Sequence, residues 1–472
     1  MRSAALFPEK NALWINERYY TYGQLLEELN SVYAKIPADG NFSHIAIYCN
    51  DDVQTYASIL AVSIYGAAWI PLNDKFPAAR NRKILEQSKA DLILSSATHS
   101  IEEIAANIPV IATQQRTIET TELLQKTEQP FAYILFTSGS TGEPKGVPIK
   151  KENVNHFFDW YLEKYDFSSE DRFLQVYELS FDVSVFSFFM PLMVGACAYI
   201  VPGSGIKFVQ IMKMLKEHRI TVLSMVPSVL HFAEKYLDEL NFPELRYSFF
   251  SGDSLYQDLA LKWKKTLPNG QIHNFYGPTE TTIVCTRHCW KDSDPAPANG
   301  IVPLGKAFDG LEILIVNEDL HPAQKGELCF SGTQVFSGYL EPSYDCFLMY
   351  NDKKSYRTGD IVSINEAGDL LFYGRSDQQV KISGFRVELK EVEMALRSVC
   401  GMNAIVLAVE GENGKKELNA FTETTSLNEK EINASLAEHL PFYMIPTRYV
   451  LNVEFPLNAN GKVDRQKLLC TR

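Results

Sequence analysis

The residues best suited to chemistry lie at positions 137–146, TSGSTGEPKG, directly after an apolar, strand-like segment at 133–136. Glycines let a backbone bend so that its N–H groups turn inward and bind an anion. Hydroxyl side chains add donors, and Lys145 adds a positive charge for a phosphate. A flexible Ser/Gly linker is the alternative, but a linker does not normally follow an apolar strand and end in Pro-Lys-Gly. The run therefore predicts a phosphate-binding loop made by Thr137, Ser138, Gly139, Ser140, Thr141, Gly142 and Lys145.

This loop lacks the G-x-x-x-x-G-K-[ST] spacing of nucleotide triphosphatases, so it is a loop of another kind. Four further polar residues could serve chemistry, and most have an ordinary structural interpretation as well. Asp182 precedes an apolar run, as a helix N-cap does. Glu280 follows a Gly-Pro turn, where a carboxylate can bind a metal or face solvent. Asp360, if ionised, can accept hydrogen bonds from two neighbouring hydroxyl groups. Lys462, in an Asn-Gly turn, is by itself an exposed lysine.

Strand-like and helix-like segments alternate through the first third of the chain. Thr21 is expected to cap a helix. Strands are expected at 44–48, 68–72, 91–94 and 133–136, with helices at 53–65 and from Pro77 toward 87. This alternation predicts an α/β architecture with mostly parallel, buried sheets. A charged stretch at 375–381 then precedes a new helix-like run at 389–399. We therefore expect a large N-terminal domain of several subdomains, residues 1–376, and a small mobile α+β domain, residues 377–472.

Composition narrows the class of protein. The 472 residues are 46% hydrophobic and 22% charged, as in ordinary globular proteins, and the net charge of −13 disfavours a nucleic-acid partner. The N-terminus has no signal-peptide pattern. Pro191 and Gly195 interrupt the uncharged segment at 183–201, which predicts a buried helix and a strand rather than a membrane span. Eight cysteines without a C-x-x-C pair predict free thiols in a reducing cytoplasm, not a zinc site.

A series of motifs runs along the chain beyond the phosphate loop. They are YGPTET at 276–281, GEL at 326–328, YRTGD at 356–360, GRSD at 374–377, KISGFRVE at 381–388 and NGKVDR at 460–465. In content and order they resemble the adenylate-forming superfamily, which includes acyl- and aryl-CoA ligases, luciferases and amino-acid adenylation domains of nonribosomal peptide synthetases. The resemblance implies an enzyme that uses ATP and Mg²⁺ to adenylate a carboxylic acid and then transfers the acyl group to a thiol.

The resemblance also implies roles around the nucleotide. The phosphate loop would hold the β- and γ-phosphates, Glu280 would bind Mg²⁺, and Lys462 would bridge the reacting carboxylate and the α-phosphate. Tyr276 would stack on adenine. The other implied nucleotide contacts are Asp253 and Asn274 at the adenine edge, Thr279 beside Glu280, and Asp360 and Arg375 at the ribose. Asp377 would be the hinge about which the C-terminal domain rotates between the half-reactions, so that the segment around Gly384 lines the path of the thiol.

Asp182 decides the subclass that the resemblance implies. In amino-acid adenylation domains an aspartate here pairs with the α-ammonium group, and ligases for plain acids generally lack it. The implied pocket is lined by Val183, Phe186, Ser224, Phe249, Ser251, Phe275, Ile283 and Val284. None of these is charged, and the phenylalanines make the pocket shallow, so we expect a small neutral amino acid: alanine, glycine, serine, proline or valine.

The layout is similar to that of free-standing D-alanine–carrier ligases. The expected acceptor is then the phosphopantetheine thiol of a separate carrier protein, and we expect a cytoplasmic monomer without a membrane partner. A domain excised from a larger synthetase would look the same. Two other functions stay open: an acyl- or aryl-CoA ligase of the same superfamily, and a catalytically silent nucleotide-binding scaffold.

Overall fold

The computed structural model describes most of the chain. The described residues are 2–37, 40–97, 101–105, 107–116, 122–139, 142–203, 205–295, 297, 299–341, 346–377, 379–411, 416–456, 463 and 465–469. No helix among them has the length and apolar character needed to cross a bilayer. The seven cysteines that fall within these ranges are all free thiols.

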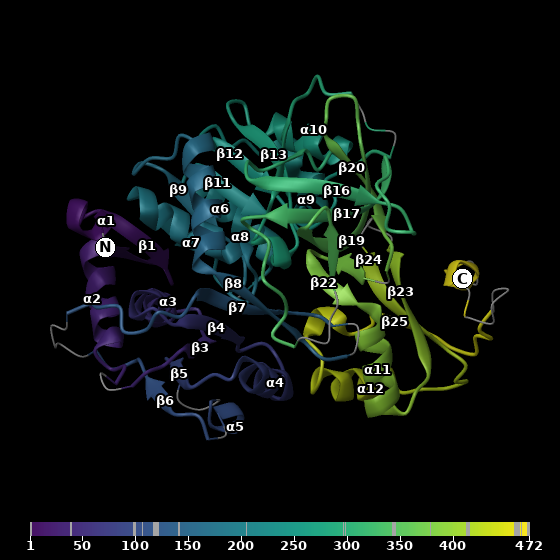
Figure 1. Cartoon of the computed structure of the whole chain (residues 1–472), viewed down its shortest axis with the longest axis horizontal. Helices are drawn as coiled ribbons and strands as arrows, with labels where there is room; N and C mark the ends of the chain where they lie inside the picture. The colour runs from purple at the N-terminus through teal and green to yellow at the C-terminus, as the bar shows by residue number, and fades with distance from the viewer. Residues whose placement is uncertain are drawn as a thin grey trace.

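Two large sheets dominate the first part of the chain (Figure 1). The first has the strand order β15 (Lys306–Ala307), β14 (Thr286–Trp290), β13 (Gln271–Tyr276), β12 (Tyr247–Phe250), β11 (Val222–Met225), β9 (Arg172–Gln175), β10 (Cys197–Ile200), β1 (Asn11–Ile15) and β2 (Arg18–Thr21). The second has the order β6 (Val110–Ala112), β5 (Leu92–Ser95), β3 (His44–Cys49), β4 (Ala68–Asn73), β7 (Phe131–Thr137) and β8 (Lys145–Lys150). Within each sheet the central strands pair in parallel and antiparallel strands lie at the edges, as strand–helix alternation predicts.

Helices connect the parallel strands, and they pack both between the two sheets and on the outer face of each sheet. They are α1 (Arg2–Leu6), α2 (Tyr22–Tyr33), α3 (Val53–Tyr65), α4 (Ala78–Ser88), α5 (Glu102–Ala105), α6 (Lys151–Lys164), α7 (Val183–Val194), α8 (Lys207–Glu217), α9 (Ser228–Ala233) and α10 (Gln257–Lys265). The largest hydrophobic cluster joins both sheets to α3, α6 and α7 through buried side chains such as Tyr56, Phe157 and Phe188. This shared core fixes the position of the two sheets relative to each other.

The segment from 183 to 201 forms α7 followed by β10, as predicted. Gly195 ends the helix with a left-handed φ of 78°, a conformation that favours glycine. A third sheet follows in the chain, with β16 (Leu311–Val316), β17 (Lys325–Gly332), β19 (Lys353–Ile364) and β18 (Phe347–Tyr350) in order, and β20 (Leu370–Arg375) paired to β19.

The remaining elements form a small unit that we call the lid. It contains β21 (Gln379–Ile382), β22 (Phe385–Glu388), α11 (Leu389–Cys400), β23 (Ala404–Glu410), β24 (Lys416–Thr422), α12 (Glu429–Ala437), β25 (Arg448–Val450) and α13 (Arg465–Leu469). The lid has its own hydrophobic core, which includes Val387, Val392 and Leu436. The predicted boundary at residues 376 and 377 lies in the short connection between β20 and β21.

Candidate active site

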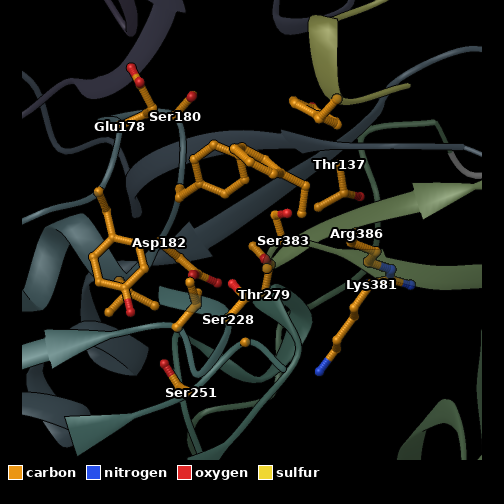
Figure 2. A pocket seen from close by; sticks show the side chains of 18 of the residues that line it. Thr137, Glu178, Ser180, Asp182, Ser228, Ser251, Thr279, Lys381, Ser383 and Arg386 are labelled. Carbon is orange, nitrogen blue, oxygen red and sulfur yellow. The ribbon is translucent and has the colours of Figure 1, made fainter. Parts of the chain in front are cut away.

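A cavity of about 460 Å³ lies where the first sheet, β7 and the lid meet. Its walls include residues that directly follow the parallel strands β9, β11, β12 and β13. Ligands of open parallel sheets bind outside the carboxyl ends of the strands, because the connections diverge there. Figure 2 shows Thr137, Asp182, Ser251 and Arg386 around this one space. Segments far apart in the sequence therefore supply polar groups to a common cleft.

The phosphate loop begins at the end of β7. Thr137 and Ser138 both line the cavity. At Gly139 a Cβ would lie 1.9 Å from the carbonyl oxygen of Glu143, so only glycine permits this turn. Lys145 begins β8, and burial lowers the pKa of its ammonium group. The predicted loop residues Ser140 and Thr141 lie outside the described residues.

Two hydrogen bonds join the lid to the described part of this loop. The Ser138 hydroxyl donates to the carbonyl oxygen of Arg386 at 2.8 Å, and the Gly139 N–H donates to Glu391 Oε2 at 3.2 Å. The other oxygen of Glu391 accepts from Arg80 Nη1 at 2.8 Å, in an ion pair whose side chains are 2% and 5% exposed. A carboxylate of the lid thus occupies a backbone donor of the loop that was predicted to bind phosphate.

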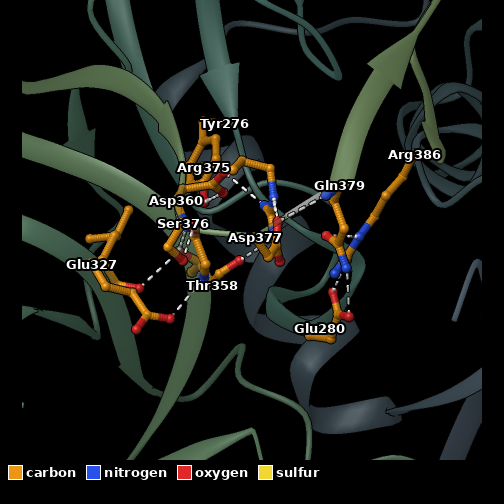
Figure 3. Close-up of polar contacts among 12 residues, drawn as sticks. Tyr276, Glu280, Glu327, Thr358, Asp360, Arg375, Ser376, Asp377, Gln379 and Arg386 are labelled. Carbon is orange, nitrogen blue, oxygen red and sulfur yellow. Dashed lines mark hydrogen bonds and ion pairs between the residues drawn. The ribbon is translucent and has the colours of Figure 1, made fainter. Parts of the chain in front are cut away.

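Glu280 lies in the short 3₁₀ helix η2 (Thr279–Thr281) and is fully buried. Arg386 Nη1 approaches both of its carboxylate oxygens at 3.0 Å, and the Tyr339 hydroxyl donates to one of them at 2.6 Å. Burial alone would raise the pKa of Glu280, but Arg386 and Tyr339 outweigh it and hold the pKa below its ordinary value. Glu280 is therefore an ionised carboxylate that binds a cationic group of the lid, and it lies next to Thr279 of the cavity wall without lining the cavity itself (Figure 3).

Asp360 forms a second polar cluster at the edge of the cavity. It accepts from the Tyr276 hydroxyl at 2.5 Å and from Arg375 Nη1 at 2.7 Å (Figure 3). Arg375 also pairs with Asp377 at 2.7 Å, which connects the cavity to the start of the lid. These four residues come from three predicted motifs, and Tyr276, Asp360 and Arg375 all line the cavity.

Asp182 lines the same cavity at the start of α7. Its side chain makes no capping hydrogen bond, so helix capping does not explain this aspartate. Burial raises its pKa to about 6, and the Thr279 hydroxyl and the backbone N–H of Val183 offset only part of that rise. No ion pair joins this half-buried carboxylate to a lysine, arginine or histidine in the described part of the chain, so Asp182 favours a cationic ligand group.

Comparison with known proteins decides the family. The profile of the family described as AMP-binding enzyme matches residues 1–340. The chain belongs to the AMP-binding enzyme family. It is 32% identical to the D-alanine–D-alanyl carrier protein ligase of Bacillus licheniformis, over 98% of this chain and 96% of that protein. It is 31% identical to the L-proline–[L-prolyl-carrier protein] ligase of Streptomyces coelicolor, over 95% and 91% of the two chains.

Other relatives are much longer than this AMP-binding enzyme. The chain spans 36% of the delta-poly-L-ornithine synthetase of Acinetobacter baumannii, to which it is 30% identical over 99% of its own length. Among solved structures, the adenylation domain AlmE of Vibrio cholerae, in complex with glycyl-adenosine-5′-phosphate, superposes with a TM-score of 0.86. It shares 26% identity with this chain, and the match covers 100% of this chain and 97% of that one. These findings confirm the predicted superfamily, the α/β fold class and the enzyme class of AMP-forming ligases.

The AMP-binding enzyme brings only part of the predicted substrate pocket to the cavity surface. Asp182, Val183, Ser251 and Ile283 line the cavity. The other predicted pocket residues are buried behind this surface: Phe186, Ser224, Phe249, Phe275 and Val284. The rings of Phe249 and Phe275 lie 5.3 Å apart and those of Phe186 and Phe249 lie 5.8 Å apart, which makes a closed aromatic layer.

The predicted adenine-edge residues lie differently from the expectation. Asn274 donates its side-chain amide to the carbonyl oxygens of Val302 and Pro303, and it is not part of the cavity wall. Asp253 accepts a hydrogen bond from the backbone N–H of Ser254 and also stays outside the wall. The structure does place Thr279 at the cavity surface.

Lys462, the predicted catalytic cation of this enzyme, lies outside the described residues. Its neighbour Arg465 donates to Glu393 of α11 at 2.7 Å and to the carbonyl oxygen of Val406 at 2.8 Å. Arg465 is not among the residues that line the cavity.

Several cavity residues had no role assigned from sequence. Lys381, Phe385 and Arg386 belong to the motif KISGFRVE, which identified the family without showing that these side chains enter the cleft. Gly384, whose segment was expected to line the path of the thiol, stands in the same motif and lines the cavity; a Cβ there would lie 2.5 Å from Val226 Cγ1. Tyr177 and Glu178 carry no sequence signal, because they follow β9 in a turn without a recognisable motif.

Proposed function

We propose that this enzyme uses ATP and Mg²⁺ to convert a small neutral amino acid into aminoacyl-AMP and pyrophosphate. It then passes the aminoacyl group to the phosphopantetheine thiol of a separate carrier protein. The observation that carries the proposal is the common cleft, which is lined by Thr137 and Ser138 at the start of the phosphate loop, by Asp360 and by the half-buried carboxylate of Asp182. The two carrier-protein ligases that match this chain nearly end to end support the carrier as acceptor.

In the first half-reaction a carboxylate oxygen of the amino acid attacks the α-phosphorus of ATP. A new P–O bond forms, and the bond from that phosphorus to the bridging oxygen breaks as pyrophosphate leaves. Asp182 holds the α-ammonium group, and Asp360 accepts hydrogen bonds from the ribose diol. Lys145 and the loop N–H groups stabilise negative charge on the leaving phosphates, and Lys462 stabilises it at the reacting α-phosphate.

Glu280 is the residue that fits Mg²⁺. It is an ionised, buried carboxylate that already accepts a cationic guanidinium, and Mg²⁺ binds through carboxylate and phosphate oxygens. The metal, when bound, supplies positive charge that stabilises the departing pyrophosphate. In the lid orientation described here, Arg386 contacts both oxygens of Glu280 and supplies a positive charge where the metal would bind. We infer that Arg386 moves away from Glu280 for the first half-reaction, in a different lid orientation.

In the second half-reaction the thiol sulfur attacks the carbonyl carbon of aminoacyl-AMP. A C–S bond forms, the C–O bond to AMP breaks, and the thiol proton passes to solvent. We assign the lid orientation described here to this step, because Arg386 of the lid then contacts Glu280, the residue that would hold the metal of the first half-reaction. Gly384 packs against Val226 in this orientation, and a Cβ at Gly384 would lie 2.5 Å from Val226 Cγ1.

Amino-acid-dependent exchange of pyrophosphate into ATP tests the proposal. The panel contains the twenty amino acids, D-alanine and β-alanine, with fatty and aryl acids as comparators. We expect exchange with a small neutral amino acid and none with the comparators. Exchange with fatty or aryl acids alone would establish a CoA ligase instead, and ATP binding without exchange on any acid would support a silent scaffold. Thioester formation on a phosphopantetheinylated carrier, compared with CoA, then identifies the acceptor.

A further inference from the structure

Tyr177 occupies a fixed position at the carboxyl edge of the first sheet, two residues after β9. The buried side chain of Gln175 donates to the Tyr177 carbonyl oxygen at 3.0 Å and accepts from the Tyr177 N–H at 3.2 Å. Tyr177 lines the main cavity and also a second, smaller polar cavity of about 70 Å³. Its side chain is therefore part of the partition that closes this end of the main cavity.

Two hydroxyl groups at this end are buried without a hydrogen-bond partner in the part of the chain that the structure describes. They are the Tyr177 hydroxyl and Ser251 Oγ. Ser251 is 4% exposed and lines the cavity (Figure 2). Burial raises the pKa of Tyr177, and the nearby hydroxyls of Ser224 and Ser251 oppose that rise, although neither completes a hydrogen bond to it. Buried polar groups are normally satisfied, so this pair points to a polar ligand group.

Buried aromatic side chains pack next to Ser251. Phe249 stands two residues before Ser251, in β12, and the centre of its ring lies 5.3 Å from that of Phe275. Phe186 in turn lies 4.6 Å from Tyr161, ring to ring. A ligand side chain that reaches Tyr177 and Ser251 from the Asp182 end must therefore be short.

We propose that Tyr177 and Ser251 are specificity-determining residues that select a small amino acid with a side-chain hydroxyl, of which serine is the smallest. This inference rests on the proposed amino-acid adenylation. A hydroxyl can donate one hydrogen bond and accept others, so it can pair with both protein hydroxyls at once. A methyl group in the same place leaves both unpaired, and a site built to bond a hydroxyl rejects the analogue that lacks it.

The experiment measures kcat/KM in pyrophosphate exchange for serine, threonine, alanine, glycine and valine. We expect wild type to favour serine over alanine by at least about tenfold. Tyr177→Phe and Ser251→Ala each remove one hydroxyl with little change in volume, and each should lower the serine-to-alanine ratio by roughly two- to tenfold. Tyr133→Phe and Ser184→Ala are matched controls: their hydroxyls are also buried and have no hydrogen-bond partner among the described residues, but neither residue lines the cavity. The controls should keep the wild-type ratio.

The outcomes separate this inference from the proposed function. If no amino acid stimulates pyrophosphate exchange, the proposed function itself is overturned. Strong exchange in which wild type prefers alanine or glycine to serine would overturn the inference and leave the function standing. The inference is also overturned if Tyr177→Phe and Ser251→Ala change the ratio no more than the controls do. Because the wild-type panel decides the question alone, a variant that fails to fold does not remove the test.

Discussion

The ionised carboxylate of Asp182 should destabilise the unliganded enzyme, and the Asp182→Asn variant should show by how much. Burial raises its pKa from 3.8 to about 6. Because the folded-state pKa lies above the unfolded one, the folded protein holds more protons between these two values. Stability contributed by this group therefore falls as pH rises through that window, and the cost is complete above about pH 6. A shift of about two units, at about 1.4 kcal/mol each, corresponds to about 3 kcal/mol.

Chemical denaturation of wild type and Asp182→Asn between about pH 4 and about pH 8 measures this cost. We expect the asparagine variant to be more stable by up to about 3 kcal/mol at the upper end, with the difference shrinking toward pH 4. The same variant should lose amino-acid-dependent exchange, since it has no charge for the α-ammonium group. A variant that is no more stable than wild type at about pH 8, or whose advantage does not change with pH, would refute the reasoning.

Asp171→Asn is the matched control for a buried aspartate. Asp171 accepts two hydrogen bonds from Arg246 Nη1, at 2.7 Å and 2.9 Å, so its charge has a partner in the folded state. The asparagine variant weakens that ion pair and should be less stable than wild type. The free energy of unfolding should rise in Asp182→Asn and fall in Asp171→Asn, relative to wild type. Such opposite changes would show that the lack of an ion-pair partner for Asp182, and not burial of a carboxylate as such, causes the instability.

Three further predictions concern the division of labour between the two half-reactions. Lys462→Ala should nearly abolish adenylation but leave thioester formation from supplied aminoacyl-AMP largely intact; equal loss in both steps would contradict its assigned role. Arg386→Gln should slow thiol transfer by about a hundredfold or more, because the lid orientation described here then buries Glu280 without its cation, while pyrophosphate exchange is affected much less. Single-turnover transfer measures this, and a larger loss in exchange than in transfer would refute it. Gly384→Ala places a Cβ 2.5 Å from Val226 Cγ1 at a φ of +86°, so it too should impair transfer more than exchange in the same pair of assays.

Local sequence determined the elements and the family of this enzyme. Thr21 and Gln24 form a reciprocal capping box at the start of α2, and α3 covers the predicted residues 53–65. Caps, turns and hydrophobic periodicity depend on residues within a few positions of each other, so the sequence carries them directly. The phosphate loop was predicted for the same reason, because its glycines and hydroxyls are contiguous.

Tertiary structure alone decided how the cleft is closed. Arg386 reaches Glu280 across 106 positions, and Glu391 reaches the Gly139 N–H across 252. The motif containing Arg386 identifies the family but does not say toward which carboxylate its side chain points, since that depends on the orientation of the whole lid. Tyr177 carries no motif, and it became a candidate only when the first sheet placed its hydroxyl beside Ser251. Contacts between distant segments follow from how the sheets and the lid pack, and local sequence does not encode that packing in a readable pattern.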